Sequence, residues 1–468
     1  MASPVTDSDE PLTPAGRLFL QPEMDQIIHC VIGFKNPLDT ESIKAGLRNS
    51  ILLKHPRFSS LMVRDRHGVE YWRKTSIDFD RHIITIESPI TTASVDDETA
   101  VNEYLADLST GPGLSTDKPL WEIQLLKAHK CVVLRIHHCL GDGISLMSML
   151  LACCRKVDDD NALPTIGSAS NRTKSKEGKL ERRCLGRFWG FLKMVWFSFV
   201  YVVEFILRCL CVCDRQTAIS GGAGVELWPR KLVTARFWLR DMKVVKKAIP
   251  NATINDVLFG VISSGLSRYL DHQATNVLQE GLQITGVAMV NLREQPGVQE
   301  LSNLMMRSNI GSRWGNKFGI VLLPIQYQKS GTDPLQYLKR AKVMIDRKKQ
   351  SAEAHFSYRI GYFVMTRLGA KLASLLNYRI VCNTSFTISN IVGPQEEIAF
   401  RGNPISYLRA TSSGLPHALT MHMVSYAGRA DMQILVAKDI IPDPEFLAKC
   451  FEEALLQMKE AAEAVVKA

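Results

Sequence analysis

The chain has 468 residues, of which 46% are hydrophobic and 22% are charged. This composition is that of a globular protein and excludes a disordered chain, a collagen and a coiled-coil rod. The length predicts two or three domains with a large core. The formal net charge of +10 at pH 7 fits nucleic acid, an anionic membrane face or a phosphorylated ligand as a partner.

Neither the cysteines nor the first residues indicate a secreted or metal-binding protein. The 11 cysteines are scattered, and they show no paired CxxC spacing of a zinc site. Residues 1–14 are acidic and proline-rich, and they lack the basic and apolar segments of a secretory signal. We therefore expect no metal, and we expect the globular parts to lie in a reducing compartment.

Hydrophobic periodicity predicts a mixed α/β (α+β) fold. The predicted helices cover residues 40–53, 144–154, 254–269 and 445–468. The predicted strands cover residues 27–34, 131–136, 284–291 and 319–325. A polar, charged stretch over residues 156–179 is typical of a surface linker. The expected organisation is an N-terminal half (1–155), a linker region (156–231) and a C-terminal half (232–468).

The linker region contains an apolar segment, residues 188–213, with a basic flank at Arg182, Arg183 and Arg187. Its longest uncharged stretch has ten residues, whereas a membrane-spanning helix needs about 20 apolar residues. On a helix, Lys193, Glu204 and Arg208 fall within about 60° of one another, and the last two can pair at i,i+4.

One charged stripe on an otherwise apolar helix predicts membrane association, because basic flanks attract anionic lipid. The helix either lies in the interface or spans the bilayer with its stripe against protein. A helix packed on the core of the protein itself is the alternative.

The segment most indicative of chemistry is Arg135-Ile136-His137-His138-Cys139-Leu140-Gly141-Asp142-Gly143. Side chains alternate along a strand, so the two histidines point to opposite faces and only one of them enters a given site. A neutral imidazole can accept the proton of an attacking hydroxyl. The glycines permit a tight turn with positive φ, and Asp142 between them can pair with a cation to hold the turn. A histidine pair alone is more often structural.

The complete HHxxxDG pattern resembles the signature of CoA-dependent acyltransferases with the chloramphenicol-acetyltransferase-like fold. Further segments narrow this resemblance: 119–122 is similar to a PLWE motif, 255–257 to NDVVLA and 389–394 to SNVPGP, while Gly315-Asn316 and 425–428 follow in order. Together they resemble the plant-type branch of the wax ester synthase/diacylglycerol acyltransferase family over nearly the whole chain. Leu258-Phe259-Gly260 and Ile391 depart from the motifs without removing a polar group.

This resemblance implies two chloramphenicol-acetyltransferase-like halves around a central tunnel with His138 as general base. It implies a structural Asp142, for which Arg293 is the suggested cation partner, beside His137 and Gly143. Asn255 would hold the oxyanion, because an amide N–H is a suitable donor. The implied cosubstrate is a long-chain acyl-CoA, and the implied acceptor is a fatty alcohol (wax ester synthesis) or diacylglycerol (triacylglycerol synthesis). No bound cofactor and no covalent acyl-enzyme are implied.

Two alternatives share the fold. A soluble CoA acyltransferase of secondary metabolism would carry a DFGWG loop. That loop is absent, and residues 313–315 resemble it only weakly. A non-catalytic lipid-binding membrane protein would not need His138, Asp142 and Asn255. We do not expect nucleic acid as a partner, because the positive charge lies beside an apolar helix. Membrane lipid is an expected partner, and the expected location is the cytosolic face of the endoplasmic reticulum membrane, or the cell membrane.

Overall fold

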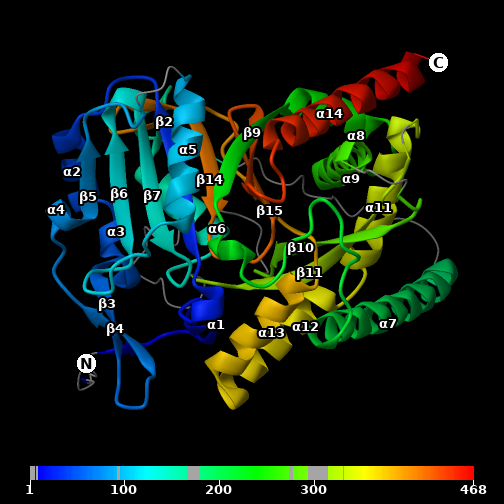
Figure 1. Cartoon of the computed structure of the whole chain (residues 1–468), viewed down its shortest axis with the longest axis horizontal. Coiled ribbons are helices and arrows are strands. Elements are labelled where there is room, and N and C mark those ends of the chain that lie inside the picture. The colour runs from blue at the N-terminus through cyan, green and yellow to red at the C-terminus, as the bar shows by residue number, and fades with distance from the viewer. Residues whose placement is uncertain are drawn as a thin grey trace.

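The computed structural model describes residues 6, 9–91, 95–165, 180–273, 278–293, 315–329 and 331–467, and of residues 180–188 and 466–467 it describes the backbone only. Two twisted sheets stand side by side, one built mainly from the blue and cyan segments and one from the green to orange segments in Figure 1. Helices cover both sheets. The mixed α/β class predicted from the sequence is confirmed.

The first sheet has seven strands, and most of it comes from the N-terminal part of the chain. Its strands lie in the order β5 (Ile83–Ile86), β6 (Trp121–Leu126), β7 (Cys131–His137), β2 (Ile27–Phe34), β14 (Asn403–Ser412), β13 (Ile398–Phe400) and β8 (Arg155–Lys156). A separate small sheet contains β1 (Glu10–Pro11), β4 (Glu70–Lys74) and β3 (Ser60–Arg64).

Both faces of the first sheet are buried. Alternate residues of β7 pack on opposite sides: Val132 joins the cluster under α2 (Thr40–Arg48) and α6 (Gly143–Cys153), while Val133 joins the cluster under α5 (Asp97–Thr110). All six residues of β6 are buried. The buried strand β7 of this sheet ends at His137.

The second sheet has six strands from the C-terminal part of the chain. Their order is β11 (Phe318–Gln326), β10 (Gln283–Asn291), β12 (Phe386–Val392), β15 (Leu419–Tyr426), β16 (Arg429–Ala437) and β9 (Arg230–Trp238). One face packs on α8 (Leu239–Lys247), α9 (Ile254–Gln273), α11 (Pro334–Lys349) and α14 (Pro444–Lys467). The other face contacts α7 (Leu180–Leu210), α12 (Glu353–Phe363) and α13 (Ala370–Cys382) through a smaller cluster that includes Phe205, Val287 and Ile380.

At one place, a segment from the C-terminal half of the sequence belongs to the first sheet. Residues 398–412 leave the second sheet, and β14 pairs with β2, with Leu408 opposite Ile32 and Ala410 opposite Cys30. A strand from the C-terminal part thus completes the first sheet. The predicted boundaries at residues 155 and 232 stay a prediction, and the linker between them is described only up to residue 165 and from residue 180.

The single helix predicted over residues 40–53 is wrong. The structure has α2, which ends at Arg48, and a separate α3 (Ile51–Lys54). Ser50 between them has extended backbone angles, and its Oγ donates to the Leu47 carbonyl at 2.7 Å. A serine hydroxyl that bonds the preceding turn competes with the continuing helix. The other predicted helices and strands agree with the structure within a few residues at each end, apart from the apolar segment.

The apolar segment forms the end of the longer helix α7, and its expected Glu204–Arg208 pair is also wrong. The Arg208 guanidinium instead lies 2.6 Å from Asp214 and donates to the Thr285 hydroxyl at 2.8 Å. Glu204 lies 3.8 Å from Lys348. Both side chains therefore face the body of the protein, where partners distant in sequence lie closer than a helical neighbour. The basic flank Arg182, Arg183 and Arg187 lies outside the described side chains.

Candidate active site

His138 occupies the turn that follows β7, between the two sheets. Its backbone N–H donates to the Gln26 carbonyl at 2.9 Å, and its carbonyl accepts from the Asn316 amide at 2.9 Å. The Phe19 ring stacks on the imidazole, with the centroids 4.0 Å apart, and Phe318 presents its edge. Segments from both parts of the chain thus fix the imidazole in one orientation.

The His138 side chain lines a cavity of about 130 Å³ between the sheets. The other walls include Gln26 from the N-terminal part and Met289, Asn390 and His422 from the C-terminal part. Burial lowers the pKa of His138 to about 4, although the charge of Asp142 offsets part of this effect. At neutral pH the imidazole is therefore uncharged, which is the form that can accept a proton.

His137 points away from this cavity. Its Nε2 lies 2.8 Å from an Asp25 carboxylate oxygen, and its Nδ1 accepts the backbone N–H of Cys139 at 3.2 Å. It is absent from the cavity wall that His138 lines. Both ring nitrogens are thus engaged in holding the turn to the segment before β2.

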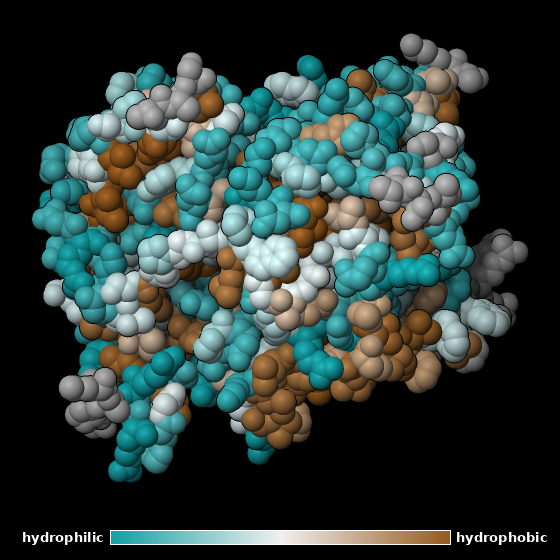
Figure 2. Space-filling view, viewed as in Figure 1, coloured by the Kyte–Doolittle hydropathy of each residue, from teal (hydrophilic) through white to brown (hydrophobic). Residues whose placement is uncertain are grey.

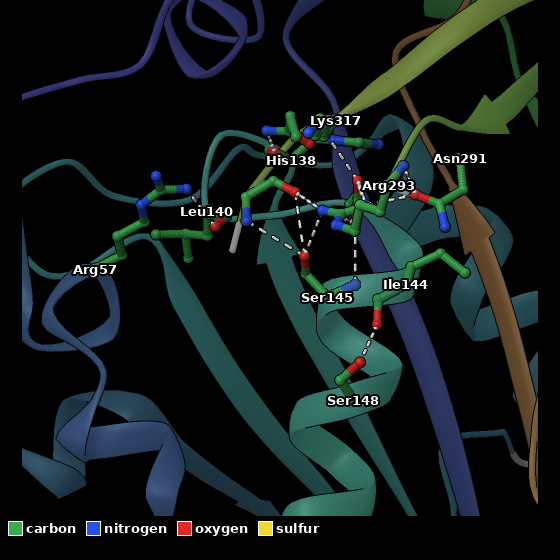
Figure 3. Close-up of polar contacts among 12 residues, drawn as sticks. Arg57, His138, Leu140, Ile144, Ser145, Ser148, Asn291, Arg293 and Lys317 are labelled. Carbon is green, nitrogen blue, oxygen red and sulfur yellow. Dashed lines mark hydrogen bonds and ion pairs between the residues drawn. The ribbon is translucent and has the colours of Figure 1, made fainter. Parts of the chain in front are cut away.

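Asp142 caps the N-terminus of α6 and is fully engaged by hydrogen bonds. Its carboxylate accepts the backbone N–H groups of Ser145 at 3.0 Å and Lys317 at 3.1 Å. The Arg293 guanidinium contacts both carboxylate oxygens, at 2.8 and 3.2 Å. Figure 3 shows Arg293, Ser145 and Lys317 converging at the start of this helix. The structure therefore places Arg293 where the sequence analysis expected a cation, and the pair ties the two parts of the chain together next to His138.

Gly143 provides space rather than unusual backbone. Neither Gly141 nor Gly143 adopts a left-handed φ, so the positive φ that the sequence allowed is not used. A Cβ added to Gly143 would lie 2.6 Å from Cδ1 of Ile391. These two residues line both the His138 cavity and a second cavity of about 110 Å³ between α6 and the first sheet. Nearly all side chains around the second cavity are hydrophobic, including Ile32, Leu47, Leu52, Val132, Met149 and Ile405.

Comparisons with known proteins show the family to which this chain is similar. The family model of the wax ester synthase/diacylglycerol acyltransferase catalytic domain matches residues 49–258, and that of the WS/DGAT C-terminal domain matches residues 314–459. Wax ester synthase/diacylglycerol acyltransferase 11 of Arabidopsis thaliana is 36% identical over 97% of this chain and 96% of its own length. Wax ester synthase/diacylglycerol acyltransferase 5 of the same plant is 35% identical over 97% and 94%.

This chain belongs to the wax ester synthase/diacylglycerol acyltransferase family. The predicted family and the predicted enzyme class, an acyl-CoA-dependent O-acyltransferase that forms wax esters or triacylglycerol, are thereby confirmed. These relatives favour this family over the soluble alternative.

Solved structures support the fold. The wax ester synthase/diacylglycerol acyltransferase from Marinobacter aquaeolei VT8 superposes with a TM-score of 0.59 at 15% identity, covering 97% of this chain and 100% of that one. The first condensation domain of the calcium-dependent antibiotic synthetase superposes with a TM-score of 0.57 at 14% identity, covering 97% and 96%. The chain thus has the two-sheet fold of acyltransferases and condensation domains.

Of the residues expected at the site, Asn255 does not line the His138 cavity, and neither do His137 and Arg293. Asn255, at the second position of α9, is exposed, and its Oδ1 accepts from the Asn390 amide at 2.8 Å. Asn390 lines the cavity and Asn255 does not. Of these two amides, the one that lines the cavity is therefore Asn390, in the 389–394 segment.

Sequence reasoning missed three residues of the site: Phe19, Gln26 and His422. Phe19 and Gln26 come from the segment before β2, which carries no motif that was recognised. His422 lies on β15 opposite Ser389, and its Nε2 lies 3.3 Å from the Ser412 hydroxyl. A histidine in the apolar strand directly before the recognised 425–428 segment was the one available signal.

Proposed function

We propose that this enzyme transfers a long-chain acyl group from acyl-CoA to the hydroxyl of a fatty alcohol or of diacylglycerol, with His138 as general base. The observation that carries the proposal is a buried, uncharged imidazole in a cavity that adjoins a hydrophobic one. Acyl-CoA is used as a cosubstrate, and the chain's own residues perform the proton transfers.

His138 is the group that carries the proton from the acceptor hydroxyl to the leaving thiolate. His138 accepts the proton of the acceptor hydroxyl, and the oxygen forms a bond to the thioester carbonyl carbon. The tetrahedral oxyanion then collapses, the carbon–sulfur bond breaks, and the imidazolium returns the proton to the departing thiolate. The products are one ester and one free CoA.

The remaining candidates position this chemistry. Asp142 and Arg293 hold the turn that carries His138, and His137 holds the same turn from its other side. We assign Asn255 an indirect role, because its contact with Asn390 orients an amide that lines the cavity. Both predicted halves, 1–155 and 232–468, contribute to the cavity walls, and β14 of the second half lines the cavity beside β2 of the first.

Product analysis of the purified enzyme tests this function. Palmitoyl-CoA is supplied together with hexadecanol and dioleoylglycerol, and esters and free CoA are quantified. We expect wax ester, triacylglycerol or both, in total equal to the CoA released. A folded enzyme that forms neither ester would contradict the proposal.

The hydrophobic cavity next to His138 is the proposed site of the acyl chain. Gly143→Ala places a methyl group against Ile391 where the two cavities meet. One methyl group in a hydrophobic pocket is worth roughly 10–200-fold in discrimination. We expect kcat/KM for palmitoyl-CoA to fall at least about ten-fold, while butyryl-CoA is used as by the wild type.

The double variant Gly143→Ala/Ile391→Val is the matched control, because valine lacks the Cδ1 atom that the new methyl group would contact. It should recover most of the activity with palmitoyl-CoA. Equal losses with palmitoyl-CoA and butyryl-CoA, or no recovery in the double variant, would place the acyl chain elsewhere.

We also propose that α7 attaches the enzyme to the cytosolic face of the endoplasmic reticulum membrane, or to the cell membrane, with both halves in the cytosol. Within the described part of the chain, Trp189–Leu210 is the helix that is long and apolar enough to cross a membrane by length and composition. Its side chains from residue 189 onward are largely exposed. Water-insoluble acceptors would then be available where the enzyme is attached.

A further inference from the structure

A second exposed hydrophobic surface lies outside α7. Helices α12 and α13 are joined by a π-helical turn (Val364–Leu368), and we call residues 353–382 the elbow. Six of its hydrophobic side chains are between 37% and 57% exposed: Ile360, Tyr362, Phe363, Leu368, Leu372 and Leu375. Figure 2 shows brown surface along the lower edge of the molecule, where Figure 1 places α13, α12 and α7. Contiguous apolar surface of this kind marks an interaction site.

The elbow and α7 form one continuous surface. The Ser198 hydroxyl on α7 accepts the backbone N–H of Ala352, directly before α12, at 2.9 Å. Phe205 packs edge-on against Phe356 of the elbow, with the centroids 6.2 Å apart. Asn383, directly after α13, donates to the Arg208 carbonyl at 2.6 Å. Opposite these contacts, Trp196 and Phe199 are 62% and 63% exposed.

These contacts favour a flat orientation of α7 over a spanning one. They lie on one side of the helix from Ser198 to Arg208, a length of about 15 Å. If this length crossed the hydrocarbon core, the buried Arg208–Asp214 pair and the elbow would be drawn into it as well. A helix that keeps one side on its protein and presents an apolar side outward instead lies flat in the interface.

The charge of the elbow fits an anionic lipid surface. Residues 354–395 contain no Asp or Glu. Their basic residues Arg359, Arg367, Lys371 and Arg379 are all exposed. Basic residues beside exposed apolar and aromatic side chains are the usual composition of a surface that binds phosphatidylserine-type headgroups.

The elbow also contacts the segment that covers the catalytic histidine. Val364, Met365 and Ala373 pack with Leu18 of α1 (Pro14–Leu18). The next residue, Phe19, stacks on the His138 imidazole. A partner bound to the elbow would therefore lie one layer of side chains away from the His138 site.

We propose that the elbow and α7 together form a docking surface for an anionic phospholipid bilayer, with Tyr362, Phe363 and Leu368 inserted at the level of the headgroups. This inference rests on the membrane attachment proposed above for α7, and it adds the elbow as a second contact that fixes the enzyme flat on the surface. The orientation brings the α1 side of the active site toward the lipid that contains the acceptors.

Flotation of the full-length enzyme with vesicles tests the elbow. Two kinds of vesicle are used, one of phosphatidylcholine alone and one with phosphatidylserine as about one lipid in three. Each is mixed with the wild type and with the elbow variant, Tyr362→Ser/Phe363→Ser/Leu368→Ser. The wild type should float with the anionic vesicles, and the bound fraction of the elbow variant should fall at least about ten-fold. A control variant, Trp238→Ser/Leu456→Ser/Val465→Ser, removes side chains elsewhere that are 52–56% exposed and should float as the wild type does.

Two further measurements separate this inference from the proposals on which it rests. Transfer from palmitoyl-CoA to hexanol in detergent should be equal in the wild type and the elbow variant, which shows that the variant is folded. The variant Trp196→Ser/Phe199→Ser/Val203→Ser reports on α7 alone. An elbow variant that floats like the wild type while the α7 variant does not would overturn the elbow contact and leave the α7 attachment standing.

A wild type that transfers acyl groups but floats with neither kind of vesicle would overturn both membrane proposals and leave the enzymatic one intact. Sedimentation of the wild type without lipid tests whether a second copy of the chain, rather than lipid, binds to this surface. A stable dimer that the elbow variant abolishes would assign the surface to a second copy of the chain and overturn the inference.

Discussion

His138→Ala is expected to lower kcat by roughly 10²–10⁴-fold, the usual contribution of a general base, whereas His137→Ala retains substantial activity. The structure gives the reason for this difference. The imidazole of His138 lines the cavity between the sheets, while both ring nitrogens of His137 are used by Asp25 and by the Cys139 backbone. Initial rates with palmitoyl-CoA and hexadecanol measure both variants.

Circular dichroism and thermal melting serve as the control for this pair of variants. His137 bridges the turn to the Asp25 segment, so its removal should lower the melting temperature more than removal of His138 does. Equal losses of activity in two variants that both remain folded would contradict the assignment of His138 as the single base.

Asp142→Asn is expected to destabilise the fold by roughly 3–5 kcal/mol, the usual cost of leaving one charge of a buried ion pair without its partner. The Asp142 and Arg293 side chains are only 9% and 8% exposed. The substitution would leave the guanidinium buried, and it would weaken the cap of α6 and the contact with Lys317. Urea unfolding measures the change, and Asp158→Asn in an exposed loop is the matched control.

A double variant separates the free energy of the Asp142–Arg293 ion pair from the contributions of the surrounding hydrogen bonds. Asp142→Asn combined with Arg293→Gln should cost clearly less than the sum of the two single changes, because removing both charges leaves neither unpaired. An Asp142→Asn enzyme that unfolds like the wild type and yet has no activity would give Asp142 a direct role in the chemistry.

The sequence predicted those parts of the site that depend on local pattern. Strand alternation predicted different directions for His137 and His138, and only His138 lines the cavity, although β7 ends at His137 and His138 lies in the turn after it. Asp142 was expected to pair with a cation, and Arg293 supplies it 151 positions later. The mixed α/β class followed from periodicity alone. The family resemblance carried by the ordered motifs then narrowed the chemistry, and the structure brings residues of HHxxxDG and of the 389–394 segment to one cavity.

Features that depend on contacts distant in sequence were missed or wrong. Glu204 and Arg208 were expected to pair as helical neighbours, but Asp214 and Lys348 lie in better positions. The exchange of β14 into the first sheet carries no local signal, because its pattern is that of any buried strand. Phe19 reaches His138 by folding, and nothing in the residues around it indicates that contact.

The pH dependence of kcat/KM tests the central claim most directly, because it reports the ionisation of the essential base in the free enzyme. Burial lowers the pKa of His138 to about 4, so the imidazole stays uncharged as the pH falls from 8 to about 5, and it is protonated only below that range. General-base catalysis by His138 therefore predicts a flat profile from about pH 8 to 5 and half-maximal activity near pH 4, with folding followed by circular dichroism at each pH. Half-maximal activity near pH 6.5, the value of an exposed histidine, in a protein that remains folded would contradict the buried, uncharged base.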